Sequence, residues 1–165
     1  SEEKSAKGAQ RWSHQMRLEF WEQALEALRG AGLERWQNIT PSRDHWLNSS
    51  VGVSGCTLTL IFLRHEVRVE FQLNRSDAAE NKWLFDQLVA KKEDSERVVG
   101  EELEWRRMDE KKVSMMTCKT PVQGYSKESW PEMIAWLVEH YRKMDEAFSE
   151  PVRGLAARMK PGGGS

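Results

Sequence analysis

The hydrophobic positions of this chain change their spacing along the sequence, and each change marks a predicted element. Residues 10–29 carry apolar side chains three or four positions apart, which indicates one face of an amphipathic helix. These positions are Trp12, Met16, Phe20, Trp21, Ala24, Leu25 and Leu28. Gly30 supplies a left-handed stop, with Gly32 just beyond it.

Alternation replaces the helical spacing in the middle of the chain. Residues 56–63 are apolar on nearly both faces, as expected of a central strand. In residues 67–73 the apolar side chains alternate with Arg68, Glu70 and Gln72, so the polar side chains share one face. The three residues between the two runs predict a β-hairpin, and a short strand is expected before it, over 48–53.

A second helix is predicted after this hairpin. Asp77 and Glu80 form a capping box, and the apolar pattern of Leu84, Phe85 and Leu88 follows. We expect this helix to continue to Val99 and to end at Gly100. Residues 103–105 and 113–117 then alternate, which predicts a second hairpin.

The last helix is predicted to begin at a second capping box, made by Ser129 and Glu132, with Pro131 in its first turn. Its apolar positions are Trp130, Ile134, Leu137, Val138, Tyr141, Met144 and Phe148. Pro151 is expected to end it, because proline removes a helical hydrogen bond.

These elements predict an α+β fold. We expect a mixed or antiparallel sheet of four to five strands packed by three main helices, in the order α-β-β-(β)-α-β-β-α. A single domain should span residues 9–155, after a disordered N-terminus at 1–8. Residues 156–165 form a tail that ends in an artificial-looking Gly/Ser linker, so we expect the chain to be a piece of a longer protein.

The amino-acid composition limits which classes of function we expect for this protein. The 25 basic and 26 acidic residues give a net charge of -1, so no global field favours nucleic acid or an anionic membrane. No apolar run reaches the roughly 20 residues that a membrane span needs, so a cytoplasmic protein without membrane contact is expected. The chain has eight tryptophans, which favours core packing; a surface aromatic cluster is the alternative.

The central segment is similar to a known family. The resemblance rests on Val69-Glu70, Asn81-Lys82, Phe85, Leu88, Lys92, Glu96, Gly100, Leu103 and Trp105. Trp46-Leu47, the 52–55 segment and the helix with Trp136 also fit, so it covers roughly Phe20 to Phe148. These residues resemble an uncharacterised prokaryotic domain-of-unknown-function family, often found C-terminal to NucS-like nuclease domains and grouped with the PD-(D/E)XK, restriction-endonuclease-like fold.

The resemblance implies a degenerate restriction-endonuclease-like core and a setting in DNA processing or phage defence. In that fold an acid on one strand and Asp/Glu-x-Lys on the next hold Mg²⁺ and activate water. The matching slot here is Glu70-Phe71-Gln72, and Lys82 could take the place of the lysine. Residues 56–63 contain no acid, so Asp44 is the candidate second metal ligand beside Glu70.

The simpler interpretation of Glu70 is an ion pair with Arg68 on a half-exposed strand. Arg106, Arg107, Lys111 and Lys112 are the candidate nucleic-acid-binding residues, although a solvated charged face is the favoured interpretation of these four charges. We therefore expect a non-catalytic accessory or interaction domain without a cofactor. Its partner would be another protein or a neighbouring nuclease domain, with DNA and a second copy as further partners. A divergent Mg²⁺-dependent nuclease and an oligomerisation module are the alternatives.

Overall fold

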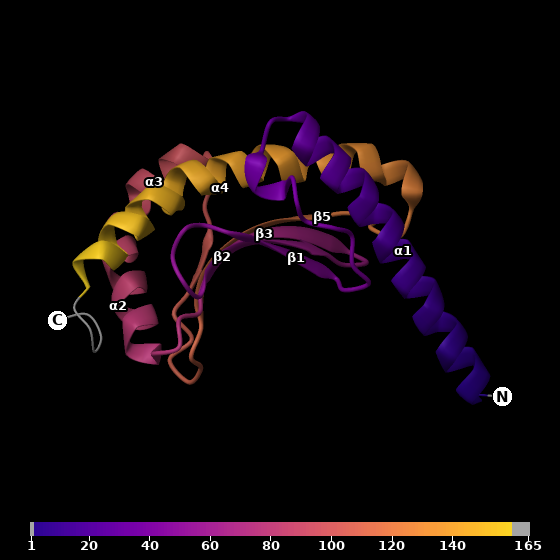
Figure 1. Ribbon diagram of the computed structural model, residues 1–165, viewed down its shortest axis with the longest axis horizontal. Helices are drawn as coiled ribbons and strands as arrows, with labels where there is room; N and C mark the ends of the chain where they lie inside the picture. Colours follow the sequence, from indigo (N-terminus) through magenta and orange to yellow (C-terminus); the bar gives the residue numbers. More distant parts are fainter. Residues whose placement is uncertain (1, 160–165) are drawn as a thin grey trace.

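A five-stranded sheet is the central layer of the molecule, and the computed structural model describes it with the rest of residues 2–159 (Figure 1). The strands are β1 (Trp46–Ser50), β2 (Cys56–Phe62), β3 (Glu66–Leu73), β4 (Glu104–Arg106) and β5 (Ser114–Pro121). They lie in the order β1-β2-β3-β5-β4, and every neighbouring pair is antiparallel. Of the two arrangements expected, the antiparallel one is present, and both predicted hairpins form.

Four α-helices accompany the sheet within residues 2–159, which confirms the α+β class but adds one helix to the three expected. They are α1 (Glu2–Gly30), α2 (Ala78–Val89), α3 (Lys92–Val99) and α4 (Trp130–Arg158). Two 3₁₀ turns, η1 (Glu34–Trp36) and η2 (Lys127–Ser129), precede β1 and α4. Over the described part of the chain, no helix is both long and apolar enough to cross a membrane.

The apolar face of the sheet packs against α4, which runs above the strands in Figure 1. The side chains of this face on β2 and β3 are fully buried: Leu58, Leu60, Phe62, Val67, Val69, Phe71 and Leu73. Phe71 contacts Phe148 of α4 with ring centroids 5.8 Å apart, and Phe62 stacks on Phe20 of α1 at 3.9 Å. The periodicity of β3 therefore identified which face of the strand is buried. The helix that mainly covers this face is α4.

The opposite face of the sheet has no helical layer. In Figure 1 the N-terminal half of α1 descends past one end of the strands and α2 past the other end. The molecule therefore forms an arch, and the uncovered face of the sheet lies on the inside of that arch. The polar side chains of β3 point to this inner side, because they alternate with the buried positions.

Helix α1 begins earlier than the apolar pattern indicated. The disorder expected for residues 1–8 is not found over 2–8, which are helical. Glutamate, lysine and alanine dominate this stretch and have high helix propensity. Lys7 also pairs with Glu3 one turn earlier, at 3.8 Å. At the other end the left-handed residue is Gly32, with φ 79°, rather than Gly30.

The expectation of one helix from Asp77 to Val99 is wrong. Lys91 has φ -116° and ψ 27°, which separates α2 from α3. The residues that follow, 91–94, are all exposed, so no apolar contact holds a straight continuation in place. The break turns α3 against α4, where Val99 is 1% exposed. Gly100 ends α3 with φ 90°, as predicted.

Pro151 does not end the last helix, which continues to Arg158. Proline there costs a backbone hydrogen bond and crowds the preceding turn. Val152 and Leu155 lie beyond it and are 0% and 9% exposed, so burial offsets that cost. The predicted domain boundary at residue 155 therefore falls inside α4, and the Gly/Ser linker lies outside the described residues.

The two capping boxes do not form as predicted. Asp77 does cap α2, since its carboxylate accepts from the backbone N–H of Ala79 at 2.8 Å. The Glu80 carboxylate, however, accepts a hydrogen bond from Arg75 at 2.8 Å, whereas a capping box would need it to accept from the backbone N–H of Asp77. Ser129 makes no side-chain cap, because η2 precedes it and its φ of -81° and ψ of -15° are already helical.

We predict that Phe85→Ala lowers the free energy of unfolding by about 3–5 kcal/mol. Phe85 is 4% exposed and its ring meets Trp105 with centroids 6.2 Å apart, so truncation leaves a cavity between α2 and the sheet. Urea denaturation measures the change. Val89→Ala is the control on the same helix, because Val89 is 38% exposed. Equal losses in the two variants would contradict this account of the core.

Candidate functional site

The uncovered face of the sheet carries Glu70, the main candidate for chemistry, at its centre. Strand register places one residue from each strand in a row across the sheet: Asn48, Thr59, Glu70, Thr117 and Glu104. Directly opposed residues share a face, so these five side chains are neighbours on the inside of the arch. A substrate or metal that reached Glu70 would have to approach through this face.

Glu70 is only 2% exposed, although no helix covers it. Gln72 donates to one carboxylate oxygen at 3.0 Å, and Thr117 donates to the other at 3.2 Å. Arg68 approaches the second oxygen at 3.6 Å. The predicted Arg68–Glu70 ion pair is therefore present, but the half-exposed environment expected for it is not. The carboxylate is a buried and internally bonded group.

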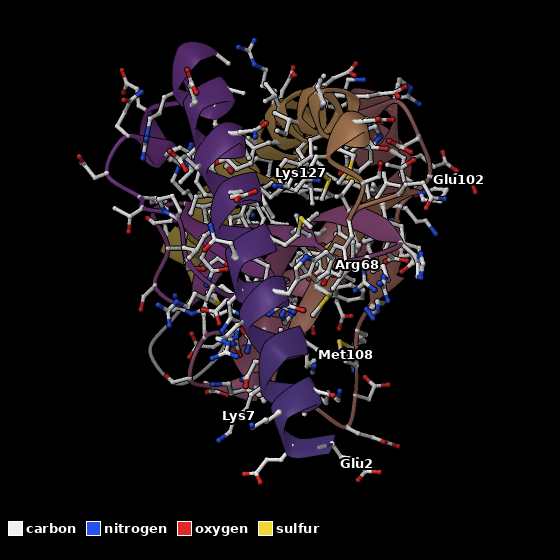
Figure 2. All side chains as sticks on the ribbon, turned by 90° about the vertical axis from the view of Figure 1, so that its right-hand side faces the viewer. Glu2, Lys7, Arg68, Glu102, Met108 and Lys127 are labelled. Atoms are coloured by element: carbon white, nitrogen blue, oxygen red, sulfur yellow. The ribbon has the colours of Figure 1, made fainter. Side chains whose placement is uncertain are left out.

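Gln72 and Arg68 are thus both partners of Glu70. The Glu70-x-Gln72 spacing does place the two side chains on one face, and there they bond to each other. Arg68 also makes a close ion pair with Glu66. Figure 2, seen from the α1 end, shows Arg68 between Lys127, next to α4, and Met108, in the loop between β4 and β5.

Asp44 is not brought to Glu70. Asn48 is level with Glu70 in the register, and Asp44 lies four residues before Asn48, in the bend that precedes β1, so up to roughly 13 Å of chain separates it from that level. Asp44 is exposed, and its backbone carbonyl accepts from the indole of Trp21 at 2.8 Å. Over residues 2–159 no three His, Cys, Asp or Glu side chains gather in a way that could hold a metal ion.

The Lys82 side chain is hydrogen-bonded to the loop between β4 and β5. Its ammonium, with three N–H donors, lies within hydrogen-bond distance of the carbonyls of Arg107, Met108 and Val113, at 2.6, 3.0 and 2.9 Å, and of the Ser114 hydroxyl, at 2.9 Å. Met108 has a positive φ of 57°, which is uncommon outside glycine, so the ammonium holds the strained turn of the loop. Burial lowers the pKa of Lys82, and the nearby Arg107 lowers that pKa further.

Lys82 and Glu70 also lie on opposite faces of the sheet. Ser114, which Lys82 contacts, pairs with Leu73, whereas Thr117 pairs with Glu70. Ser114 and Thr117 are three positions apart, and side chains an odd number of positions apart in a strand lie on opposite faces. The structure therefore brings Glu70 and Gln72 together and leaves Lys82 apart from them.

The four candidate nucleic-acid-binding residues do not act as one cationic strip. Arg107 makes a bidentate pair with Asp86, at 2.9 and 3.0 Å, and a second pair with Asp109. These two carboxylates raise the pKa of Arg107, so its charge is neutralised locally. Arg106 lies on β4, whereas Lys111 and Lys112 are exposed in the loop that follows.

Neither cysteine has the environment of a nucleophile. Burial raises the pKa of the Cys56 thiol to about 11 and that of the Cys118 thiol to about 12. Both are free and buried, so each remains a protonated thiol at neutral pH and behaves as a small hydrophobic side chain.

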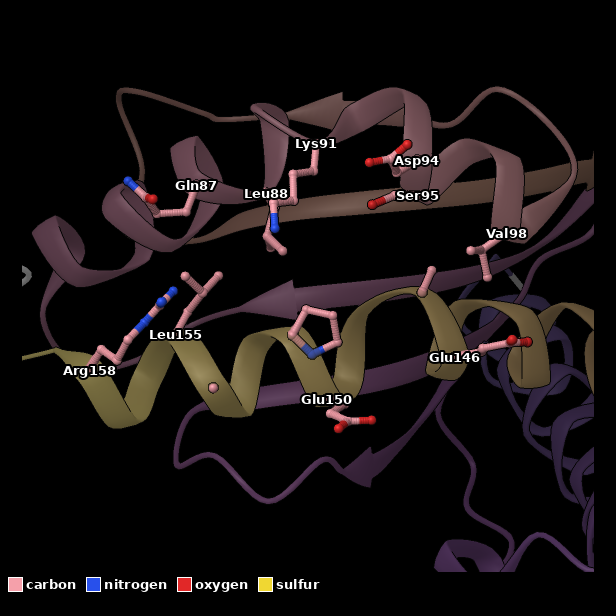
Figure 3. A pocket seen from close by; sticks show the side chains of 13 residues that line it. Gln87, Leu88, Lys91, Asp94, Ser95, Val98, Glu146, Glu150, Leu155 and Arg158 are labelled. Carbon is pink, nitrogen blue, oxygen red and sulfur yellow. The ribbon is translucent and has the colours of Figure 1, made fainter.

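A groove of about 760 Å³ separates α2 and α3 from the C-terminal half of α4 (Figure 3). Its apolar lining comes from both sides: Leu88, Val98, Ala147, Pro151 and Leu155. Charged side chains of both signs surround it: Lys91, Asp94, Glu146, Glu150 and Arg158. Val98 is 42% exposed, so part of its apolar surface is accessible.

Sequence reasoning did not identify this groove, because it forms between elements about 50 residues apart and needs both the break at Lys91 and the helix beyond Pro151. One signal was available. Val98 stands among charged residues, next to the buried Val99.

An antiparallel sheet open on one side and a long helix across the other define the class as a two-layer α+β domain. Within that class, the chain belongs to the family described as "Domain of unknown function (DUF4268)", whose model matches residues 16–152. The comparison with curated proteins gave no match, and the comparison with solved structures gave none either.

We predict that Lys82→Met lowers the free energy of unfolding by about 1–3 kcal/mol, because it leaves carbonyl acceptors of the loop without their donor. Thermal and urea denaturation provide the measurement. Lys111→Met, in an exposed position of the same loop, should change stability little. A stable Lys82→Met variant with an unaltered loop, seen by amide exchange of residues 107–114, would contradict the structural role of Lys82.

Proposed function

We propose that this domain is a non-catalytic interaction domain, and that the groove between α3 and α4 binds an amphipathic helix of a partner protein. The candidate catalytic side chains support a non-catalytic role, because Glu70 and Gln72 bond to each other and Lys82 holds a loop. The groove, in contrast, is open and apolar, and nothing in residues 2–159 fills it.

Gly154 is the observation that carries this proposal. It lies inside α4 in the lining of the groove, where glycine costs about 1 kcal/mol of helix stability relative to alanine. No atom lies within 4 Å of the position a Cβ would take, so the isolated domain has no steric need for glycine there. A partner helix that approaches the backbone of α4 closely would supply that need.

The chemistry of the groove fits an amphipathic helix. The apolar part of the lining offers a surface for the hydrophobic side of such a helix. Glu146 and Glu150 lie along α4 on one side, and Lys91 and Asp94 lie across from them on α3 and its N-terminus. Rims with charges of both signs favour a partner whose polar flanks also carry both signs.

The biological setting of the proposal comes from the family resemblance. Domains of the family that the sequence resembles are often found beside nuclease domains, and on that basis the partner helix would belong to a DNA-processing or phage-defence protein in the cytoplasm of a prokaryote. A neighbouring nuclease domain in the same longer chain is one source of the helix. The groove would then fix the position of that domain.

Catalysis by a divergent nuclease is the competing proposal, and Glu70→Ala tests it. We predict no cleavage of DNA or RNA with Mg²⁺ or Mn²⁺ by the wild-type protein. We also predict that Glu70→Ala lowers the free energy of unfolding by about 1–3 kcal/mol, because it removes a buried acceptor from Gln72 and Thr117. Metal-dependent cleavage that disappears in Glu70→Ala would overturn the non-catalytic role.

Gly154→Leu tests the groove. We predict that this variant folds with unchanged or higher melting temperature, because the added side chain enters open space. It should lose the partner, because leucine occupies the place of the partner helix. A photo-crosslinking amino acid at Val98, in the full-length protein in its own cells, measures the contact. One discrete cross-linked protein, or one internal cross-link to a neighbouring domain, is expected, and Gly154→Leu should abolish it.

Two matched controls accompany this experiment. Gly8→Leu makes the same change in α1, where the added Cβ also meets no atom within 4 Å, and it should leave the cross-link intact. The crosslinker at Val89, which is 38% exposed but lies outside the groove, should give no such product. Equal cross-linking at Val98 and Val89, or a cross-link that survives Gly154→Leu, would contradict the proposed function.

A further inference from the structure

The charges around the groove between α3 and α4 are sorted by sign along its length. On α4 the lining includes residues four positions apart, which form one stripe on a helix: Glu146, Glu150, Gly154 and Arg158. From the first to the last of them the helix rises about 18 Å. The stripe therefore has two carboxylates toward one end and a guanidinium at the other end.

The other side of the groove has the same order of charges. The Glu101 carboxylate, just after α3, lies 2.6 Å from Nε2 of His140, so the end of α3 is fixed near the first half of α4. Figure 3 shows Val98 at that end of the groove and Lys91 nearer to the end with Arg158. The basic side chains of both sides therefore share one half of the groove.

The sorted charges are not compensated within the domain. Four charged residues of the lining take part in no ion pair within residues 2–159: Lys91, Glu146, Glu150 and Arg158. Asp94 differs, because it pairs with Arg97 one turn later at 2.9 Å. The acidic half of the groove thus rests on the two glutamates of α4. A binding partner would be the first group to compensate these four charges.

We propose that the partner helix of this groove has segregated charges, basic over Glu146 and Glu150 and acidic over Lys91 and Arg158. This inference rests on the proposed function and adds the chemistry of the partner. A helix with one sign of charge along its whole length would gain at one half of the groove and lose at the other. A segment of about 12 residues is long enough to cover both halves.

Tethered model peptides test the order of the charges. Val98→Cys supplies an attachment point at the acidic end, in an exposed position where substitution costs little stability. Cys56 and Cys118 do not compete, because both are buried and burial raises the pKa of both thiols. The probes are amphipathic helices of about 14 residues with a leucine and alanine stripe, a basic half, an acidic half and one terminal cysteine.

Four such peptides separate the order of charges from the helicity of the peptide. Either the basic or the acidic half is next to the cysteine, and the cysteine is at either the N-terminus or the C-terminus. Acidic residues near the N-terminus and basic residues near the C-terminus stabilise any helix, so helicity alone favours opposite choices in the two pairs. The groove should favour the basic half next to the cysteine in both pairs.

Mass spectrometry of the mixed disulfides, at equilibrium in a glutathione buffer, measures this preference. We expect about fivefold more capture of the peptides with the basic half next to the cysteine, as a few exposed ion pairs supply. The preference should shrink at high salt. It should reverse in a protein with all four charges exchanged: Lys91→Glu, Glu146→Lys, Glu150→Lys and Arg158→Glu. Exchange of two exposed loop charges, Glu110→Lys with Lys111→Glu, should leave it unchanged.

Two further variants keep this inference separate from the proposed function. Val89→Cys, exposed but outside the groove, should capture all four peptides equally and less than Val98→Cys does. Gly154→Leu, added to Val98→Cys, should lower capture to the level of Val89→Cys. Equal capture of the four peptides at Val98, still above that level and still removed by Gly154→Leu, would overturn the charge order alone. The groove would then bind a helix through its apolar lining only.

Two other results would also overturn the inference. One is a preference that the four-charge exchange does not reverse, because the preference would then come from the peptides. The other is capture at Val98→Cys no greater than at Val89→Cys for every peptide, which would count against the helix-binding groove as well.

Discussion

The packing of α4 on the apolar face of β2 and β3 is the contact on which the other elements depend. Phe148 joins the layers, with its ring 5.8 Å from Phe71 and 5.7 Å from Trp105 between centroids. The same helix touches α1, α2 and α3. Because α4 occupies the centre of the sheet, α1 and α2 are left at its two ends, which produces the arch (Figure 1). The open inner face and the groove both follow from that arrangement.

The sequence predicted the parts of this fold that are encoded within a single element. The alternation of β3 and the helical spacing of α1 and α4 are local, and each identified the correct buried face. The errors occur where tertiary contacts decide between local alternatives. Burial of Val152 and Leu155 allows α4 to continue beyond Pro151. After the break at Lys91, helix α3 packs against α4. Neither outcome is visible in residues near the error.

The candidate site shows why residue spacing alone cannot assign chemistry. An acid and an amide two residues apart emerge on one strand face in a nuclease, but equally in a structural network. The deciding facts are the partners. Both oxygens of Glu70 accept protein hydrogen bonds, and four acceptors surround the ammonium of Lys82. Apart from Gln72, these partners come from β5 and the loop before it, between 25 and 47 residues along the chain, so no local pattern contains them.

One local choice in the lining of the groove is unfavourable for an isolated domain. Alanine at Gly154 would strengthen α4 and would meet open space. Gly8 is in the same open situation near the start of α1, but of these two glycines only Gly154 lines a groove. Glycine at this position therefore costs helix stability and keeps the backbone of α4 accessible from the groove. The proposed partner helix would use the space that this glycine leaves open.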